Sequence, residues 1–135
     1  MTESSYHGHC LCGALAYEVA GPLENVCFCH CESCRRASGA PFVAWGTCPA
    51  ERFEMTLGEL ARFHSSPPVT RGFCRRCGTS VTYVHEARPG ELDIAIATFD
   101  DPGDIKPEFH IWLDDKLAWV EISDDLPQYA QWRSP

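Results

Sequence analysis

The sequence lacks any apolar run that approaches the roughly 20 residues needed to cross a bilayer. Its first residues, Met1 to His9, are polar and lack the apolar stretch of a signal peptide. These absences predict a cytoplasmic protein with no membrane partner. Basic residues are also few, because 11 lysines and arginines stand against 19 acids, for a formal charge of -8. Since nucleic acids and anionic membranes bind basic surfaces, this charge argues against both as partners.

Helical periodicity is scarce, and short alternating or β-branched runs dominate instead. The clearest helical stretch runs from Glu32 to Ser38 and is followed by Gly39, which suits a left-handed residue at a helix end. With no internal repeat or long linker, the 135 residues predict one mainly β domain that spans 1–135. The runs expected to form strands are Ala14–Val19, Val26–Cys29, Phe42–Gly46, Leu60–His64, Ser80–Val84, Leu92–Thr98, Phe109–Leu113 and Leu117–Ile122.

Cysteine, in contrast, is abundant, with nine residues in the chain. Disulfides are rare in the reducing cytoplasm and an odd number cannot pair completely, so metal binding or thiol chemistry is the better interpretation. A thioredoxin-like redox site is disfavoured, because its cysteine pair follows a strand in a βαβ pattern that this sequence does not show.

Two cysteine pairs together predict a structural metal site. Cys10 and Cys12 lie near the N-terminus, whereas Cys74 and Cys77 lie far along the chain and are followed by Gly78. A pair separated by two residues and followed by glycine forms a knuckle that turns both sulfurs toward one ion. Four thiolates make a closed tetrahedral zinc site, whose binding energy becomes folding energy. Four cysteines also support an iron–sulfur cluster, which spacing alone leaves open.

A third group, formed by Cys29, Cys31 and Cys34, predicts a different kind of site. Three protein ligands leave the fourth position of a tetrahedral zinc to water or substrate, as in catalytic sites. Cys27 lies two residues earlier on the same strand face and could close the site as a fourth ligand. A buried core role is the favoured interpretation of Cys27, and of Cys48, because free cysteine is among the most buried residue types.

Arginines gather around these cysteines although the chain is acidic overall. They suit a substrate that carries carboxylates, and they equally suit neutralisation of the charge on zinc–thiolate centres. The five that lie within three positions of a predicted ligand are Arg35, Arg36, Arg71, Arg75 and Arg76.

Two histidines, His30 and His110, could be ligands or proton carriers. Strand alternation instead favours His30 on the face opposite its cysteine neighbours. It favours His110 as a partly buried, hydrogen-bonded residue within an apolar run.

Seven ordered motifs give the chain a resemblance to the glutathione-dependent formaldehyde-activating enzyme family, which also contains centromere protein V. The motifs cover nearly the whole chain. They are Gly8 to Ala14, Cys29 to Arg35, Gly39 to Phe42, Arg71 to Thr79, Phe99 to Pro102, His110-Ile111 with Trp119, and Leu126-Pro127.

The resemblance implies a mainly β, Mss4-like fold of several short antiparallel sheets with one short helix, stapled by zinc. It implies two zinc ions per chain, one structural and one catalytic. By position, the structural ion would be held by Cys10, Cys12, Cys74 and Cys77. The catalytic ion would be held by Cys29, Cys31 and Cys34.

The family's founding activity, also implied by the resemblance, condenses glutathione with formaldehyde to S-(hydroxymethyl)glutathione, a carbon–sulfur lyase reaction run in reverse. An open three-thiolate zinc suits it, because the ion can bind a fourth thiol as thiolate beside an aldehyde carbon. The expected partners are therefore a glutathione-like thiol and a small aldehyde. The alternative function is a non-enzymatic zinc scaffold that binds protein partners.

Overall fold

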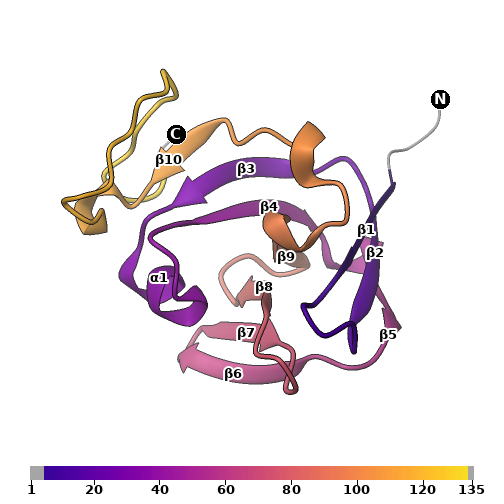
Figure 1. Cartoon of the computed structure of the whole chain (residues 1–135). Coiled ribbons are helices and arrows are strands. Elements are labelled where there is room, and N and C mark those ends of the chain that lie inside the picture. The colour runs from indigo at the N-terminus through magenta and orange to yellow at the C-terminus, as the bar shows by residue number, and fades with distance from the viewer. Residues whose placement is uncertain (1–4, 134–135) are drawn as a thin grey trace.

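Two β-sheets build the fold, which a computed structural model describes for residues 5–133 (Figure 1). The smaller sheet has the order β1–β2–β5 and consists of β1 (Ser5–His9), β2 (Ala16–Ala20) and β5 (Phe53–Leu57). The larger sheet has the order β10–β3–β4–β9–β8–β7–β6. Its strands are β3 (Glu24–Cys29), β4 (Val43–Pro49), β6 (Ala61–Ser66), β7 (Val69–Phe73), β8 (Ser80–His85), β9 (Glu91–Ala95) and β10 (Phe109–Ile111). The helical segments are α1 (Glu32–Ser38) and the 3-10 turns η1 (Ala50–Arg52), η2 (Ile96–Thr98), η3 (Pro102–Asp104) and η4 (Leu113–Asp115).

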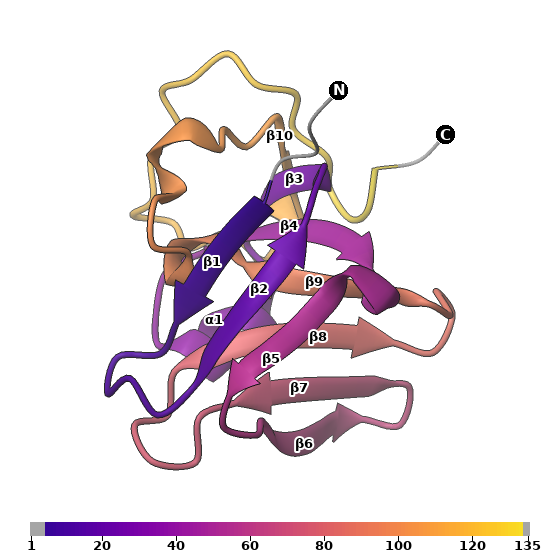
Figure 2. The same ribbon diagram turned by 90° about the vertical axis from the view of Figure 1, so that its right-hand side faces the viewer.

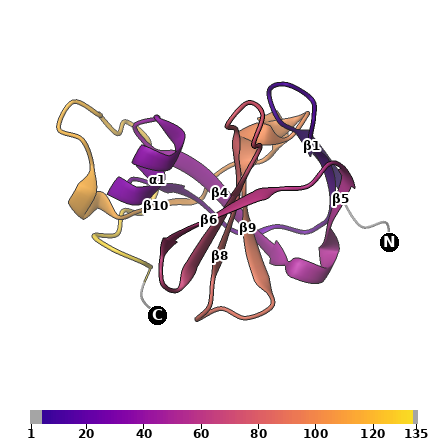
Figure 3. The ribbon, with the colours of Figure 1, turned by 90° about the horizontal axis from the view of Figure 1, so that it is seen from below.

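The two sheets pack against each other with their strands crossed. Figure 2 shows the smaller sheet lying across one face of the larger one. Helix α1 and the C-terminal segment lie on the other side, with strands of the larger sheet between them and the smaller sheet (Figures 1 and 3). Neighbouring strands are antiparallel, apart from β10, which runs parallel to β3. This confirms the predicted mainly β fold of antiparallel sheets with one short α-helix.

The core between the sheets follows from the alternation of apolar residues. Leu15, Tyr17 and Val19 are buried, as the run Ala14–Val19 predicts, and Ile94 of β9 belongs to the same cluster. Burying each large apolar side chain contributes about 1.5–3 kcal/mol. The cluster therefore holds the smaller sheet onto the larger one.

Helix α1 has the bounds that the sequence predicts. It begins after Cys31, whose sulfur accepts a hydrogen bond from the N–H of Cys34 at 3.3 Å. It ends at Gly39, whose φ of 68° is left-handed and favours a residue without Cβ. Within residues 5–133, no helix is long and apolar enough to cross a membrane.

Most predicted strands are confirmed to within a few residues, but the sequence does not predict β1, β5 or β7. In β1 only Gly8 is buried, so this strand has no apolar face to reveal it. In β5 the apolar residues Phe53, Met55 and Leu57 do alternate with polar ones, but none is fully buried and the expected runs do not include them. In β7 the buried residues include Arg71 and Gly72, which interrupt the apolar pattern of a strand. Pairing with neighbouring strands places all three in the sheets, and Phe53 and Met55 of β5 also pack against the core.

The expected strand Leu117–Ile122 is wrong, because this segment forms a turn. The N–H of Val120 donates to the carbonyl of Leu117 at 3.0 Å. The ammonium of Lys116 donates to the carbonyls of Leu117 at 3.1 Å and Val120 at 2.6 Å. Backbone acceptors that a strand would pair with a neighbour are thus satisfied locally.

Candidate metal centres and active site

The first cysteine group brings two distant turns together. Cys10 and Cys12 follow β1, and Cys74 and Cys77 lie between β7 and β8, yet all four sulfurs lie within 4.8 Å of one another. The Cys10 and Cys12 sulfurs are 3.7 Å apart, and those of Cys12 and Cys74 are 3.8 Å apart. A tetrahedral zinc with bonds of about 2.3 Å would separate its sulfurs by roughly 3.8 Å. The group could therefore hold a metal ion with its four positions filled by the chain.

The turn after Cys74 has the shape predicted for a knuckle. The N–H of Gly78 donates to the carbonyl of Cys74 at 2.8 Å, and Gly78 has a φ of 82°, in the left-handed region that favours glycine. Thr79 ties the two turns together, because its hydroxyl accepts the N–H of Leu11 at 3.1 Å. Hydrogen bonds from the Thr79 hydroxyl and backbone lower the pKa of Cys77 to about 5, which favours the thiolate that a metal needs.

The second group gathers where β3 leads into α1. Cys29 ends β3, Cys31 precedes α1 and Cys34 lies in its first turn, and the three sulfurs lie within 4.8 Å of one another. Hydrogen bonds from Cys29 and Cys31 lower the pKa of Cys34, and the positive charge of Arg71 lowers it further. Three soft donors, with surroundings that favour the thiolate of Cys34, fit a zinc ion and leave one position for another ligand.

A cavity of about 680 Å³ opens beside the second group, and all three of its cysteines line it. This volume lies in the range of about 300–1,000 Å³ typical of small-molecule sites. Its aromatic lining residues are Trp45, Tyr83, Trp112 and Trp132. Its hydroxyl, amide and histidine side chains are Asn25, Ser33, Thr47, Ser65, Ser66 and His85. A smaller cavity of about 370 Å³ meets the group with four cysteines at Cys77 alone. The group with three cysteines is therefore the one whose ligands all face space for a ligand.

Two residues of the cavity wall have unusual backbone conformations. Asn25 has a φ of 49° and Trp112 a φ of 59°, and they are the non-glycine residues with positive φ among residues 5–133. Such conformations cost of order 1–3 kcal/mol and concentrate at functional sites. Their shared position supports a functional role for this cavity.

Cys27 lies close to the second group but outside it. It lines the same cavity, as its strand face predicts, yet its sulfur does not join the three that lie within 4.8 Å of one another. Burial raises the pKa of Cys27 to about 12, which keeps its thiol protonated. This geometry favours the core interpretation over a fourth ligand.

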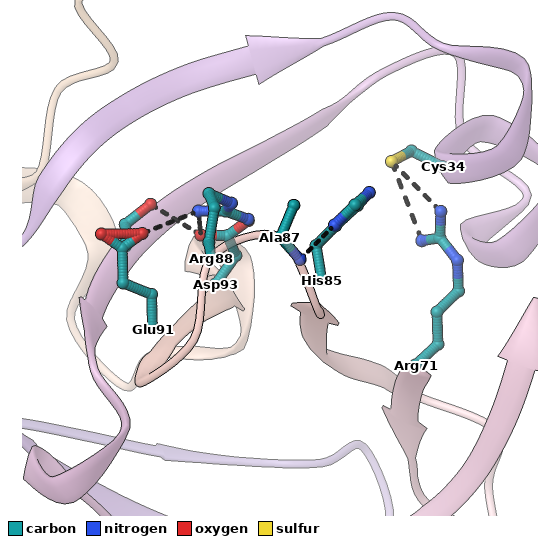
Figure 4. Close-up of polar contacts among 8 residues, drawn as sticks. Cys34, Arg71, His85, Ala87, Arg88, Glu91 and Asp93 are labelled. Atoms are coloured by element: carbon teal, nitrogen blue, oxygen red, sulfur yellow. Dashed lines mark hydrogen bonds and ion pairs between the residues drawn. The ribbon is translucent and has the colours of Figure 1, made fainter. Parts of the chain in front are cut away.

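Arg71 lies near the first cysteine group in the sequence but contacts the second group in the structure. It lies three residues before Cys74 of the first group, but its side chain reaches Cys34 of the second, with Nη2 at 3.6 Å and Nη1 at 3.7 Å from the sulfur (Figure 4). The Arg71 side chain is buried, and its guanidinium carbon lies 5.0 Å from the centre of the Tyr83 ring. Of the two interpretations of the arginines, neutralisation of thiolate charge is the one that Arg71 supports.

The other arginine of the cavity is one that the sequence does not single out. Arg88 lines the wall and donates to Asp93 from Nη1 at 3.2 Å and from Nη2 at 2.6 Å (Figure 4). Arg35 and Arg36, which a carboxylate-bearing substrate would need in the wall, do not line it, and Arg36 pairs with Glu32 on the surface. Arg88 follows β8 without a nearby cysteine, so no sequence signal marks it.

The two histidines form a buried chain behind the second group. His30 Nε2 and His110 Nδ1 are 2.9 Å apart, and His110 Nε2 donates to Asp124 Oδ2 at 2.9 Å. Both rings are buried, and neither lines the cavity. His30 thus points away from the face of its cysteine neighbours, and His110 is hydrogen-bonded, as strand alternation predicts. The hydrogen bond from His110 also lowers the pKa of Asp124.

Comparison with known proteins identifies the family that this chain matches. The model of the family described as glutathione-dependent formaldehyde-activating enzyme matches residues 5–115. An uncharacterized lyase of Schizosaccharomyces pombe is 27% identical over 125 residues, which cover 93% of this chain and 90% of the lyase. A putative glutathione-dependent formaldehyde-activating enzyme of Halomonas elongata is 29% identical over 127 residues, with 85% of this chain and 79% of that enzyme covered.

Among solved structures, a Rhodobacter sphaeroides protein has a similar fold. The alignment has a TM-score of 0.59 at 21% sequence identity and covers 91% of this chain and 98% of the other. At this identity the likeness concerns the arrangement of the sheets alone.

Proposed function

Because the chain belongs to the glutathione-dependent formaldehyde-activating enzyme family, we propose that it is a carbon–sulfur lyase-type enzyme that adds a thiol such as glutathione to a small aldehyde. The product would be S-(hydroxymethyl)glutathione if the aldehyde is formaldehyde. One observation carries the proposal: the second cysteine group has three sulfurs and faces a cavity of about 680 Å³.

We assign one zinc ion to each cysteine group of a single zinc domain. The ion in the group Cys10, Cys12, Cys74 and Cys77 would be structural, because its four protein ligands leave no position open. When bound to Cys29, Cys31 and Cys34, zinc would supply a position that holds the substrate thiol as a thiolate, the nucleophilic form. The cavity then has room for the aldehyde beside that sulfur.

The cavity residues serve the addition by holding both reactants away from bulk water. The thiolate sulfur forms a bond with the aldehyde carbon, and the π electrons of the carbonyl move to its oxygen. The proton that the thiol releases returns to this oxygen, directly or through a hydroxyl of the wall. Ser65, Ser66 and Tyr83 offer such hydroxyls, and burial raises the pKa of Tyr83, so that its phenol stays protonated. Proximity of the two reactants accounts for most of the expected rate advantage.

The test is the Cys31→Ser variant, assayed for acceleration of hemithioacetal formation from glutathione and several aldehydes by NMR exchange. We expect the variant to lose the acceleration and one equivalent of zinc while its circular dichroism spectrum stays that of the parent, because the first group remains intact. Cys48→Ala is the matched control, because Cys48 is buried but belongs to neither group. It should keep both zinc ions and the activity.

Equal acceleration by the parent and Cys31→Ser would refute the proposal. Metal content and X-ray absorption with and without glutathione separate the enzyme from a zinc scaffold. An enzyme should show one of two zinc ions gaining a sulfur ligand when glutathione is added, whereas a scaffold should hold two ions that do not respond.

A further inference from the structure

Arg71 is a buried cation whose contacts all come from the site. Its side chain is 6% exposed, and both Nη atoms lie within 3.7 Å of the Cys34 sulfur. Nε donates to the Ser65 hydroxyl at 3.2 Å, and the guanidinium lies over the ring of Tyr83, its cross-strand partner. Ser65 and Tyr83 thus hold the guanidinium against the Cys34 sulfur.

The charge of Arg71 has no carboxylate to balance it. Among residues 5–133 the ion pairs involve His9, Arg36, Arg88 and His110, but not Arg71. A buried charge without a counter-charge is strongly destabilising. The group placed to balance Arg71 is the Cys34 sulfur, which is negatively charged when it binds a metal ion.

The charge of the second cysteine group determines how Arg71 affects the binding of a fourth ligand. A divalent ion held by three thiolates carries one net negative charge, which Arg71 cancels. A neutral fourth ligand leaves that balance unchanged, whereas a fourth thiolate adds a second negative charge. With Arg71 the thiolate-bound site keeps one net negative charge, whereas without Arg71 it would have two, in a buried site where electrostatic interactions are weakly screened. Arg71 therefore lowers the electrostatic cost of an anionic fourth ligand and has little effect on a neutral one.

We propose that Arg71 is a specificity-determining residue of the second cysteine group, whose positive charge selects an anionic thiolate over a neutral molecule as the fourth ligand. This inference rests on the proposed function, because it assigns the thiol to the metal and leaves the aldehyde in the cavity. It gives Arg71 a role that Arg88 cannot share, since Arg88 is already paired with Asp93 and Glu91.

The test compares two ligands of different charge on the cobalt-substituted protein, followed by the visible absorption of the ion. The first ligand is 2-mercaptoethanol, which binds as a thiolate and has no carboxylate that could confuse the result. The second is imidazole, which binds as a neutral molecule. We expect Arg71→Met to weaken 2-mercaptoethanol about ten- to a hundredfold, the loss typical of a charged hydrogen bond, and imidazole by less than about threefold.

Two further variants separate charge from packing. Arg71→Lys keeps the charge and should hold 2-mercaptoethanol at least about threefold more tightly than Arg71→Met does. If Arg71→Met fails to fold, the affinity of Arg71→Lys for 2-mercaptoethanol is compared with that of the parent instead. Arg62→Met removes an exposed charge from the adjacent strand β6 and should bind both ligands like the parent.

Each outcome decides one claim. If the parent binds no thiol at the metal, the proposed function fails. If the parent binds 2-mercaptoethanol and Arg71→Met weakens both ligands equally, or neither, charge selection by Arg71 is refuted while the proposed function stands. A loss of 2-mercaptoethanol binding in Arg71→Lys as large as that in Arg71→Met would also refute it.

Discussion

Replacing Cys10 by alanine should prevent stable folding, although the change removes only one sulfur atom. Structural zinc sites contribute about 10–16 kcal/mol, and one of four ligands accounts for roughly a quarter of that or more, so at least about 2.5–4 kcal/mol is lost. Cys10 is fully buried, and its sulfur accepts the N–H of Leu15 at 3.3 Å, so the variant also leaves a buried donor without a partner. That adds about 1–3 kcal/mol. The total of at least about 3.5–7 kcal/mol reaches the lower part of the 5–15 kcal/mol by which domains are stable.

Cys48→Ala provides the matched control for this prediction. Cys48 is 1% exposed and belongs to the same core cluster as Cys10, but its sulfur lies outside both cysteine groups. Its truncation should cost on the order of 1 kcal/mol, since only packing is lost. If burial alone gave Cys10 its importance, the two variants would be equally stable.

The assay is thermal unfolding followed by circular dichroism, together with zinc content per chain. We expect Cys48→Ala to unfold cooperatively about 4 °C below the parent with its zinc retained. Cys10→Ala should show no cooperative transition. A Cys10→Ala protein that melts cooperatively near the parental temperature without zinc would refute the structural role of the first group.

Two other predictions concern residues near the second group. Cys27→Ala should keep the parental zinc content by atomic emission and lose on the order of 1 kcal/mol in urea unfolding, because Cys27 is a buried thiol outside the group; loss of one zinc equivalent would instead identify it as a ligand. Asp124→Ala should lower the free energy of unfolding, because it leaves the buried Nε2 of His110 without its acceptor. The control Asp125→Ala removes an exposed carboxylate and should change stability by less than about 0.5 kcal/mol; equal effects of the two changes would contradict a role for the histidine chain.

Local patterns in the sequence predict the parts of this fold that depend on few residues. The run Glu32 to Ser38, ended by Gly39, forms a helix with those bounds, because capping and a left-handed glycine act within one turn. Strands with an apolar face are also predictable from alternation. Alternation was misleading for Leu117–Ile122, which alternates like a strand but forms a turn. The ammonium of Lys116 hydrogen-bonds carbonyls of this segment, and the spacing of apolar residues does not reveal such a contact.

Membership of the two cysteine groups was predictable for a related reason. Metal ligands must be soft donors at short spacings, so Cys29, Cys31 and Cys34 stand out in the sequence by themselves. Pairing of the Cys10 turn with the Cys74 turn, across more than 60 residues, followed from counting ligands and from the family resemblance. The structure brings both sets of sulfurs within 4.8 Å.

The cavity was decided by the tertiary structure alone. Arg71 lies in sequence beside the first group, yet strand pairing of β7 with β8 and the packing of α1 place its guanidinium on Cys34, 37 positions away. Arg88 reaches the cavity in the same way, through the turn between β8 and β9. The sequence by itself determined the mainly β fold, the helix and the cysteines that could bind metal, because these depend on local periodicity and ligand chemistry. Which side chains surround the open sulfurs depends on the order of strands in the larger sheet, and only the folded chain establishes that order.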